Sequence, residues 1–292
     1  MRSFVFCVLS LSLICSSVSY NLTFAEEDAA QYLLRYKFTP SQFVHYTVDS
    51  ENKISVELNQ NKQTTINTAK TEKHYRVVWV DEKGNGTLET MIDRVQMSAQ
   101  FDKQAPATFD SQDPKQKDLK QYEKIRETIG KPTRIVYSPL GTIIPKAGDS
   151  KPENQGFLIP LPEKEVKIGD TWKEDYEIEV AVGKKLRKKI PIRRTFTLET
   201  VKDQIAEIKF KTKILTRQND PKIGLQLIQK TPSGTIKMDI EKGIIVLQDV
   251  FLDKAQVGIF QGQGAMRAIS SRVETLVDPT EIAQENKKSE AQ

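Results

Sequence analysis

Segments with the composition of β-strands recur along almost the whole chain, and they constrain its fold more than any other feature. Residues 205–214 and 244–252 are rich in Val, Ile, Phe and Thr, and turn residues separate such segments at short intervals. An Asn85-Gly86 pair stands between residues 75–80 and 88–97, which is the strongest short-range signal for a β-hairpin. The sequence therefore predicts a mainly β, antiparallel protein.

One segment departs from the strand pattern. Asp113 can cap a helix, Pro114 suits the first helical position, and Gly130 suits the end. The apolar residues between them form one stripe at helical spacing: Leu119, Tyr122, Ile125 and Ile129. We expect an amphipathic helix over residues 114–129, lying on the sheet.

The stretch VKIGDTWKEDYEIEV (166–180) reads like the start of a second unit, because a similar turn, aromatic residue and strand occur from Phe38. The sequence therefore predicts either two similar curled sheets or half-barrels, over residues 20–160 and 161–280, or one large continuous sheet. A chance likeness between two runs of antiparallel strands is the alternative to duplication. True repeats would bury both Phe43 and Trp172 at equivalent places.

Residues 184–194 are strongly basic and follow an acidic strand. If the two segments pair about Gly183, one register gives a charged outer face and an apolar inner face. The outward pairs would be Glu179 with Arg187 and Glu177 with Lys189, and the inward pairs Tyr176 with Ile190 and Val180 with Leu186. We favour this hairpin over polyanion binding and expect no nucleic-acid partner.

The beginning of the chain indicates an exported protein. Residues 1–19 have the charge and apolar run of a cleaved signal peptide, with a cut near Ser19 or Ala25. The run is too short to span a bilayer, so no transmembrane span is expected after cleavage. Both cysteines fall in the signal, and Ile14 is too large to precede a lipidated Cys15. The polar residues 281–292 should form a disordered tail.

The sequence offers little for catalysis. His45 and His74 are the two histidines of the chain, and neither has a second histidine at metal-ligand spacing. There is no nucleophile elbow and no phosphate-binding loop. We therefore assign no catalytic, cofactor-binding or metal-ligating residue and expect no cofactor. A hydrolase with two carboxylates from distant strands stays open.

Four stretches carry a resemblance to a known family. They are LRYKFTPSQFVHY (34–46), PLGTI (139–143), VKIGDTW (166–172) and SGTIKMDIEKGIIV (233–246). Together they resemble an uncharacterised family of exported bacterial proteins, with similarity from about Leu34 to Val277. The resemblance implies export and an antiparallel β fold, and it supplies no functional residues.

These patterns lead to two hypotheses about function. The first is a secreted or periplasmic, non-catalytic binding or envelope-associated protein, whose curved sheet shelters an apolar ligand such as a lipid. The alternative is a hydrolase of envelope or extracellular polymers that uses paired carboxylates. A cleft with a carboxylate pair would favour the hydrolase, and an apolar cavity would favour the binding protein.

Overall fold

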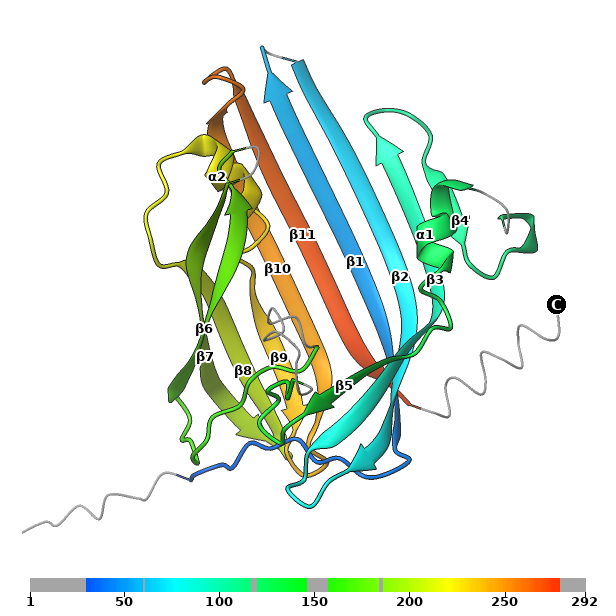
Figure 1. The fold of residues 1–292 in the computed structure, drawn as a ribbon, viewed down its shortest axis with the longest axis vertical. Coiled ribbons are helices and arrows are strands. Elements are labelled where there is room, and N and C mark those ends of the chain that lie inside the picture. Colours follow the sequence, from blue (N-terminus) through cyan, green and yellow to red (C-terminus); the bar gives the residue numbers. More distant parts are fainter. Residues whose placement is uncertain (1–29, 60, 117–119, 146–156, 184–185, 279–292) are drawn as a thin grey trace, which may run out of the picture.

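The computed structural model describes residues 30–59, 61–116, 120–145, 157–183 and 186–278. Its strands are long and are joined mostly by hairpins (Figure 1). They are β1 (Phe43–Leu58), β2 (Asn61–Val80), β3 (Gly86–Phe101), β4 (Ala107–Asp110), β5 (Thr133–Tyr137), β6 (Thr171–Ala181), β7 (Arg187–Lys202), β8 (Ile205–Ile214), β9 (Ser233–Asp239), β10 (Ile244–Ile259) and β11 (Gly264–Val277).

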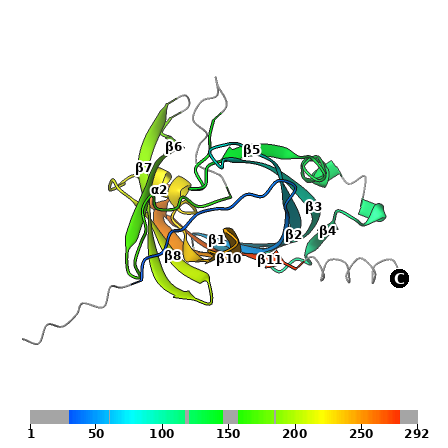
Figure 2. The same ribbon diagram turned by 90° about the horizontal axis from the view of Figure 1, so that it is seen from below.

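All strands belong to one antiparallel sheet that does not close. Its order is β4-β3-β2-β1-β11-β10-β9-β8-β7-β6, and β5 pairs separately with β3. Of the two predicted architectures, the single continuous sheet is the one found. The sheet curls into a deep trough, and β5 lies opposite β1 and β11 across the interior (Figure 2).

Alternating side chains explain which face turns inward. In β8 the buried residues are Ala206, Ile208, Phe210 and Thr212, and the residues between them are more exposed. The same alternation places Val44 and Tyr46 of β1 on the concave face. Because strand side chains alternate between faces, each hairpin register fixes one inward apolar row.

The lower end of the trough is filled by chain that is not part of the sheet. Leu34 and Tyr36 before β1, and Leu158 and Ile159 before β6, join the main apolar core. The Tyr36 hydroxyl lies 3.2 Å from the Ile159 carbonyl oxygen and 3.1 Å from its N–H. These segments form an apolar floor beneath the rest of the concave face.

The segment predicted as a helix over residues 114–129 is helical only in short turns. It contains 3-10 turns at Pro114–Gln116 and Lys120–Tyr122 and a four-residue α1 (Glu123–Arg126), while residues 117–119 lie outside the described residues. Tyr122 of the predicted apolar stripe does pack inward, stacked on Phe109 with ring centroids 4.3 Å apart.

The one described helix of seven residues is α2 (Pro221–Leu227), between β8 and β9. Asp220 caps it by accepting from the Lys222 N–H at 2.8 Å, and Pro221 occupies its first turn. Ile223 and Leu227 pack on apolar residues of β6 and β7, so α2 covers the inward side of these two strands near Val180 and Ile190.

The two strands compared in the duplication hypothesis occupy different places. Trp172 stacks on Phe196 at 5.5 Å and donates to the Pro160 carbonyl at 2.8 Å. Phe43 is 51% exposed, so the prediction that it is buried was wrong. Since β1 is central and β6 is an edge strand, the halves are not matched at this point, and the duplication stays a prediction.

The predicted signal (1–19) and tail (281–292) lie outside the described residues. Within the described part of the chain, no helix has the length and hydrophobicity needed to cross a membrane.

Candidate functional site: the concave face of the sheet

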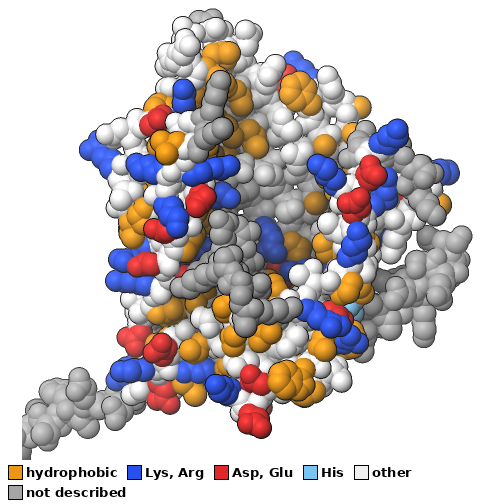
Figure 3. Space-filling model, viewed as in Figure 1, with side chains coloured by type: hydrophobic (Ala, Val, Ile, Leu, Met, Phe, Trp, Pro, Cys, Tyr) orange, Lys and Arg blue, Asp and Glu red, His pale blue; other side chains and the backbone are white. Residues whose placement is uncertain are grey.

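Above the apolar floor, polar side chains lie across the concave face. We call them the polar belt: Asn52, Lys73, Glu174, Arg194, Thr212, Arg272 and Glu274. They share the inward parity of their strands with the core residues, so the strand pairing itself turns them into the trough. Figure 3 shows this side of the molecule, hollowed between two walls that carry charged side chains.

Glu274 is the centre of one half of the belt. It is 2% exposed, and it binds Lys73 of β2 and Arg272 of its own strand β11. The Lys73 Nζ lies 2.7 Å from Glu274 Oε1 and 5.2 Å from the centre of the Phe157 ring. Two cations share one carboxylate, so this group carries one surplus positive charge.

Burial sets the acid–base behaviour of this group. Desolvation lowers the pKa of Lys73, and the neighbouring Glu274 carboxylate acts in the opposite direction by favouring the ammonium form. The Arg272 side chain is 39% exposed, so it reaches from the carboxylate toward open solvent. Arg272 is therefore the cation of this group best placed to meet a ligand that enters the trough.

The other half of the belt lies on β6, β7 and β8. Arg194 Nη1 is 3.4 Å from Glu174 Oε2, and the guanidinium lies 5.3 Å from the centre of the Phe210 ring. Burial raises the pKa of Glu174, and Arg194 partly opposes this shift. Arg194 Nε and Thr212 Oγ1 are buried with no hydrogen-bond partner among the described residues.

Unpaired buried polar atoms are unfavourable and usually need an explanation. Asn52 Oδ1, on β1, is a third such atom. All three belong to the belt, which makes the concave face a surface with donors and acceptors left for a ligand. Apolar clusters lie above the belt at Val180 with Ile190, and at Leu252 with Ala268. The face is thus apolar, then polar, then apolar along the strands.

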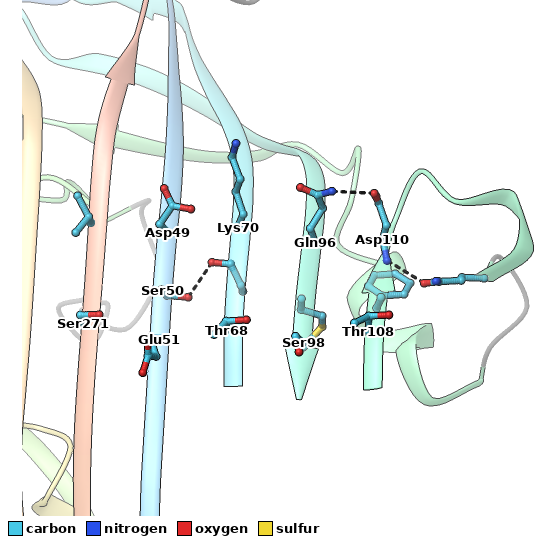
Figure 4. A pocket seen from close by; sticks show the side chains of 15 residues that line it. Asp49, Ser50, Glu51, Thr68, Lys70, Gln96, Ser98, Thr108, Asp110 and Ser271 are labelled. Atoms are coloured by element: carbon cyan, nitrogen blue, oxygen red, sulfur yellow. Dashed lines mark hydrogen bonds between the residues drawn. The ribbon is translucent and has the colours of Figure 1, made fainter. Parts of the chain in front are cut away.

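A second concavity lies on the outer face of the sheet, across β11, β1, β2, β3 and β4. It encloses about 660 Å³. Most of the residues that line it have polar side chains, with Asp49, Lys70, Gln96 and Asp110 among them (Figure 4). Asp110 accepts from Arg94 Nη2 at 2.6 Å, which with other hydrogen bonds lowers the pKa of Asp110 to about 2.

Carboxylates at the two concavities are arranged differently. On the concave face Glu174 and Glu274 each face an arginine, and they come from opposite halves of the sheet. In the second concavity, on the outer face, Asp49 and Glu51 are two residues apart on one face of β1. If the protein is a hydrolase, Asp49 and Glu51 of the second concavity are therefore the candidate carboxylate pair. The hydrolase function stays a prediction.

The basic hairpin keeps the predicted faces with a different register. Glu179 pairs with Lys189 rather than with Arg187, because the Val182 N–H donates to the Leu186 carbonyl, which centres the strand pairing one residue beyond Gly183. Glu177 and Lys189 do form the expected ion pair, at 3.3 Å. Leu186 is 65% exposed, so its predicted inward pairing with Val180 was wrong.

Arg194 lies in the basic stretch 184–194 and Glu174 in the acidic strand before it, but no belt residue was predicted from the sequence to line a concave site. A signal for them exists in hindsight, because Lys73 stands two residues from the inward-facing Tyr75 and Glu274 two residues from Leu276. A charged residue in an otherwise apolar strand row suggests a paired or functional position.

A model of a family of unknown function, DUF6263, matches residues 153–245. The match includes the VKIGDTW stretch and strands β6 to β9. It covers less than half of the chain and brings no activity. Comparison with curated protein sequences finds no significant match.

Comparison with solved structures finds distant likenesses. A lipovitellin structure, described for its lipid–protein interactions, has 11% identity and a TM-score of 0.48 over 83% of this chain, which spans only 26% of that chain. The autotransporter NalP translocator domain of Neisseria meningitidis has 8% identity, a TM-score of 0.29, and coverage of 81% of this chain and 89% of that chain.

A lipoprotein-sorting protein domain of Vibrio parahaemolyticus has 9% identity and a TM-score of 0.16, covering 82% of this chain and 90% of that chain. All three TM-scores are below 0.5, so these likenesses do not bear on function.

Proposed function

We propose that this chain is an exported, non-catalytic binding protein of the cell envelope, and that it shelters an amphipathic ligand with an anionic head group on its concave face. The observation that carries the proposal is the polar belt on the inward face of an unclosed sheet, between apolar surfaces. Binding sites of this kind are concave and mostly apolar, with a few convergent polar groups that fix orientation.

The charges of the belt select the head group. Lys73 and Arg272 together outweigh Glu274 by one positive charge, and the Arg194 Nε is a buried donor without a partner. A carboxylate or phosphate head group would accept hydrogen bonds from these cations. Such hydrogen bonds are stronger than neutral ones because both partners are charged. Its hydrocarbon part would lie on the apolar surfaces below or above the belt, removed from water.

Export is the second part of the proposal. It rests on the signal-like residues 1–19 and on the absence of cysteine after Cys15, which suits a chain that needs no reducing compartment. Amino-terminal sequencing of the protein from its native host should find a start near residue 20 or 26. A chain that still begins at Met1 would contradict export by a cleaved signal.

Ligand binding is tested with two arginines of one strand. Arg272 faces the trough, and Arg267 faces outward on the same β11, paired with Asp253 at 2.6 Å. We expect the full chain to bind oleate, measured by displacement of a fluorescent fatty acid, and Arg272→Gln to weaken binding by about tenfold, since hydrogen bonds to charged groups contribute roughly 1.5–3 kcal/mol.

The Arg267→Gln variant is the matched control and should bind like the parent chain. Vesicles of phosphatidylglycerol, used in the same assay, distinguish a phosphate from a carboxylate head group. If neither probe binds, or if both arginine variants lose binding equally, the concave face is not the site.

A further inference from the structure

Strand pairing brings the two histidines of the chain together. His45 of β1 and His74 of β2 are direct partners in the register, although 28 residues lie between them in sequence. Their ring centroids are 5.3 Å apart, and both side chains lie on the outer face of the sheet. Since the sequence contains two histidines in all, every imidazole of this protein is at this one place.

A bulge in the neighbouring strand adds a carboxylate. The register between β2 and β3 shifts at Glu72 and Lys73, which leaves Asp93 of β3 without a direct partner. Bulges commonly redirect a side chain in this way. The Asp93 carboxylate reaches His74, with 2.8 Å between Oδ2 and Nδ1.

The three side chains offer one ligand atom each, and these atoms all lie within 4.8 Å of one another. Zn²⁺ binds imidazole nitrogen and carboxylate oxygen at about 2.0–2.2 Å, so ligand atoms of one ion stand within roughly 4.2 Å of each other. Small side-chain rotations would close the difference. All three residues are partly exposed, which leaves a path for an ion and a place for water as a fourth ligand.

The surroundings do not oppose a cation. Two arginines lie near the cluster on this face. Arg76, beside Phe43, is offset by Glu89 at 2.7 Å, and Arg94, which follows Asp93, is offset by Asp110 at 2.6 Å. Two imidazoles and one carboxylate suit Zn²⁺, Cu²⁺ or Ni²⁺, whereas Mg²⁺ and Ca²⁺ prefer oxygen ligands alone.

We propose that His45, His74 and Asp93 bind one divalent transition-metal ion of the Zn²⁺ class and thereby tie β1, β2 and β3 together on the outer face. The site is independent of the concave-face ligand, because it lies on the opposite side of the same strands. It also differs from what the sequence suggested, since a cross-strand pair cannot be found from spacing along the chain.

The test is calorimetric titration of the untagged, metal-free chain with Zn²⁺ near neutral pH. We expect one ion per chain with a dissociation constant in the micromolar range, and a loss of at least about tenfold in affinity for His45→Ala and for His74→Ala. Asp93→Asn should also weaken binding. The control is Asp253→Asn, which removes an outward carboxylate of β10 paired with Arg267 and should leave binding unchanged.

A second readout does not depend on variants. The two imidazoles give the only histidine ring signals in a proton NMR spectrum, and both should shift or broaden together as Zn²⁺ or paramagnetic Ni²⁺ is added. No binding up to ~1 mM, binding that survives His74→Ala, or ring signals that respond separately would overturn the proposal. In those cases the pair of His74 and Asp93 is only a hydrogen bond.

Discussion

Replacing Glu274 by leucine tests the energetics of the polar belt. The Glu274 side chain is 3% exposed and Lys73 is 13% exposed, so the variant leaves an ammonium group in a place that water barely reaches. Removing one partner of a buried ion pair costs about 3–5 kcal/mol. Arg272 can turn toward solvent, and we therefore expect the lower end, about 3 kcal/mol, from urea unfolding followed by circular dichroism.

The double variant Lys73→Met with Glu274→Leu should recover at least half of that loss, because the residues are coupled and no unpaired charge remains buried once Arg272 turns toward solvent. Asp253→Leu on the outer face is the control, and as an exposed pair it should cost less than about 1 kcal/mol.

The pH dependence has a definite sign. Burial lowers the native pKa of Lys73 below its ordinary 10.5, so the unfolded chain binds the proton more tightly than the native chain. Stability should therefore rise as pH increases between the native pKa and 10.5. The rise should be steeper in Glu274→Leu, which lacks the carboxylate that favours the ammonium form. A single variant within about 1 kcal/mol of the parent, or a double variant no better than the single, would refute this reasoning.

Three further predictions concern other parts of the sheet. Asp110→Asn should destabilise the chain by about 1–2 kcal/mol in urea unfolding, because Arg94 holds the native pKa near 2; the contribution is complete above the unfolded pKa of 3.8 and should disappear as pH falls through about 2. Gly141→Ala should lower the free energy of unfolding by at least about 2 kcal/mol, since Gly141 has φ +75° and an added Cβ would overlap the Ile159 carbonyl, whereas Gly169→Ala at φ +93°, with open space around it, should cost less. Removing the charges of Arg187 and Lys189 should leave heparin and anionic-vesicle binding unchanged and move stability by less than about 1 kcal/mol, because the pair of Lys189 with Glu177 is exposed; strong loss of retention would favour polyanion binding.

The sequence predicted the fold class because local signals determine it. Alternating apolar residues mark β8 and the Asn85-Gly86 turn joins β2 to β3, and both depend only on neighbours in the chain. The continuity of the sheet depends on β1 pairing with β11, whose residues are more than 200 positions apart. No local pattern encodes that contact, so two sheets and one sheet were equally compatible with the sequence.

The errors have physical reasons of the same kind. The register of the basic hairpin shifted because Val182 faces Leu186 where the strands meet, which moves the centre of pairing one residue beyond Gly183. Each pair moved by two residues, so the two faces of the hairpin are those predicted. Residues 114–129 have helical periodicity, but the described part of the segment forms only short helical turns. Tertiary contacts compete with a continuous helix there, because Tyr122 stacks on Phe109 and Ile129 forms a β-bridge with Ile92.

Both candidate sites were hidden from the sequence because each is assembled across strands. Glu274 meets Lys73 through the pairing of β11, β1 and β2, and His45 meets His74 through the register of one hairpin with Asp93 added by a bulge. A charged residue in an inward row was the one local sign, and it does not identify the partner.

Native mass spectrometry of the protein purified without detergent from its native host tests the central claim most directly. We predict a population with one bound amphipathic molecule that carries a carboxylate or phosphate. The molecule should be lost from the Arg272→Gln variant and kept by the Arg267→Gln variant. A parent chain that shows only the mass of the bare polypeptide, and that stays bare after incubation with oleate or phosphatidylglycerol, would contradict the account.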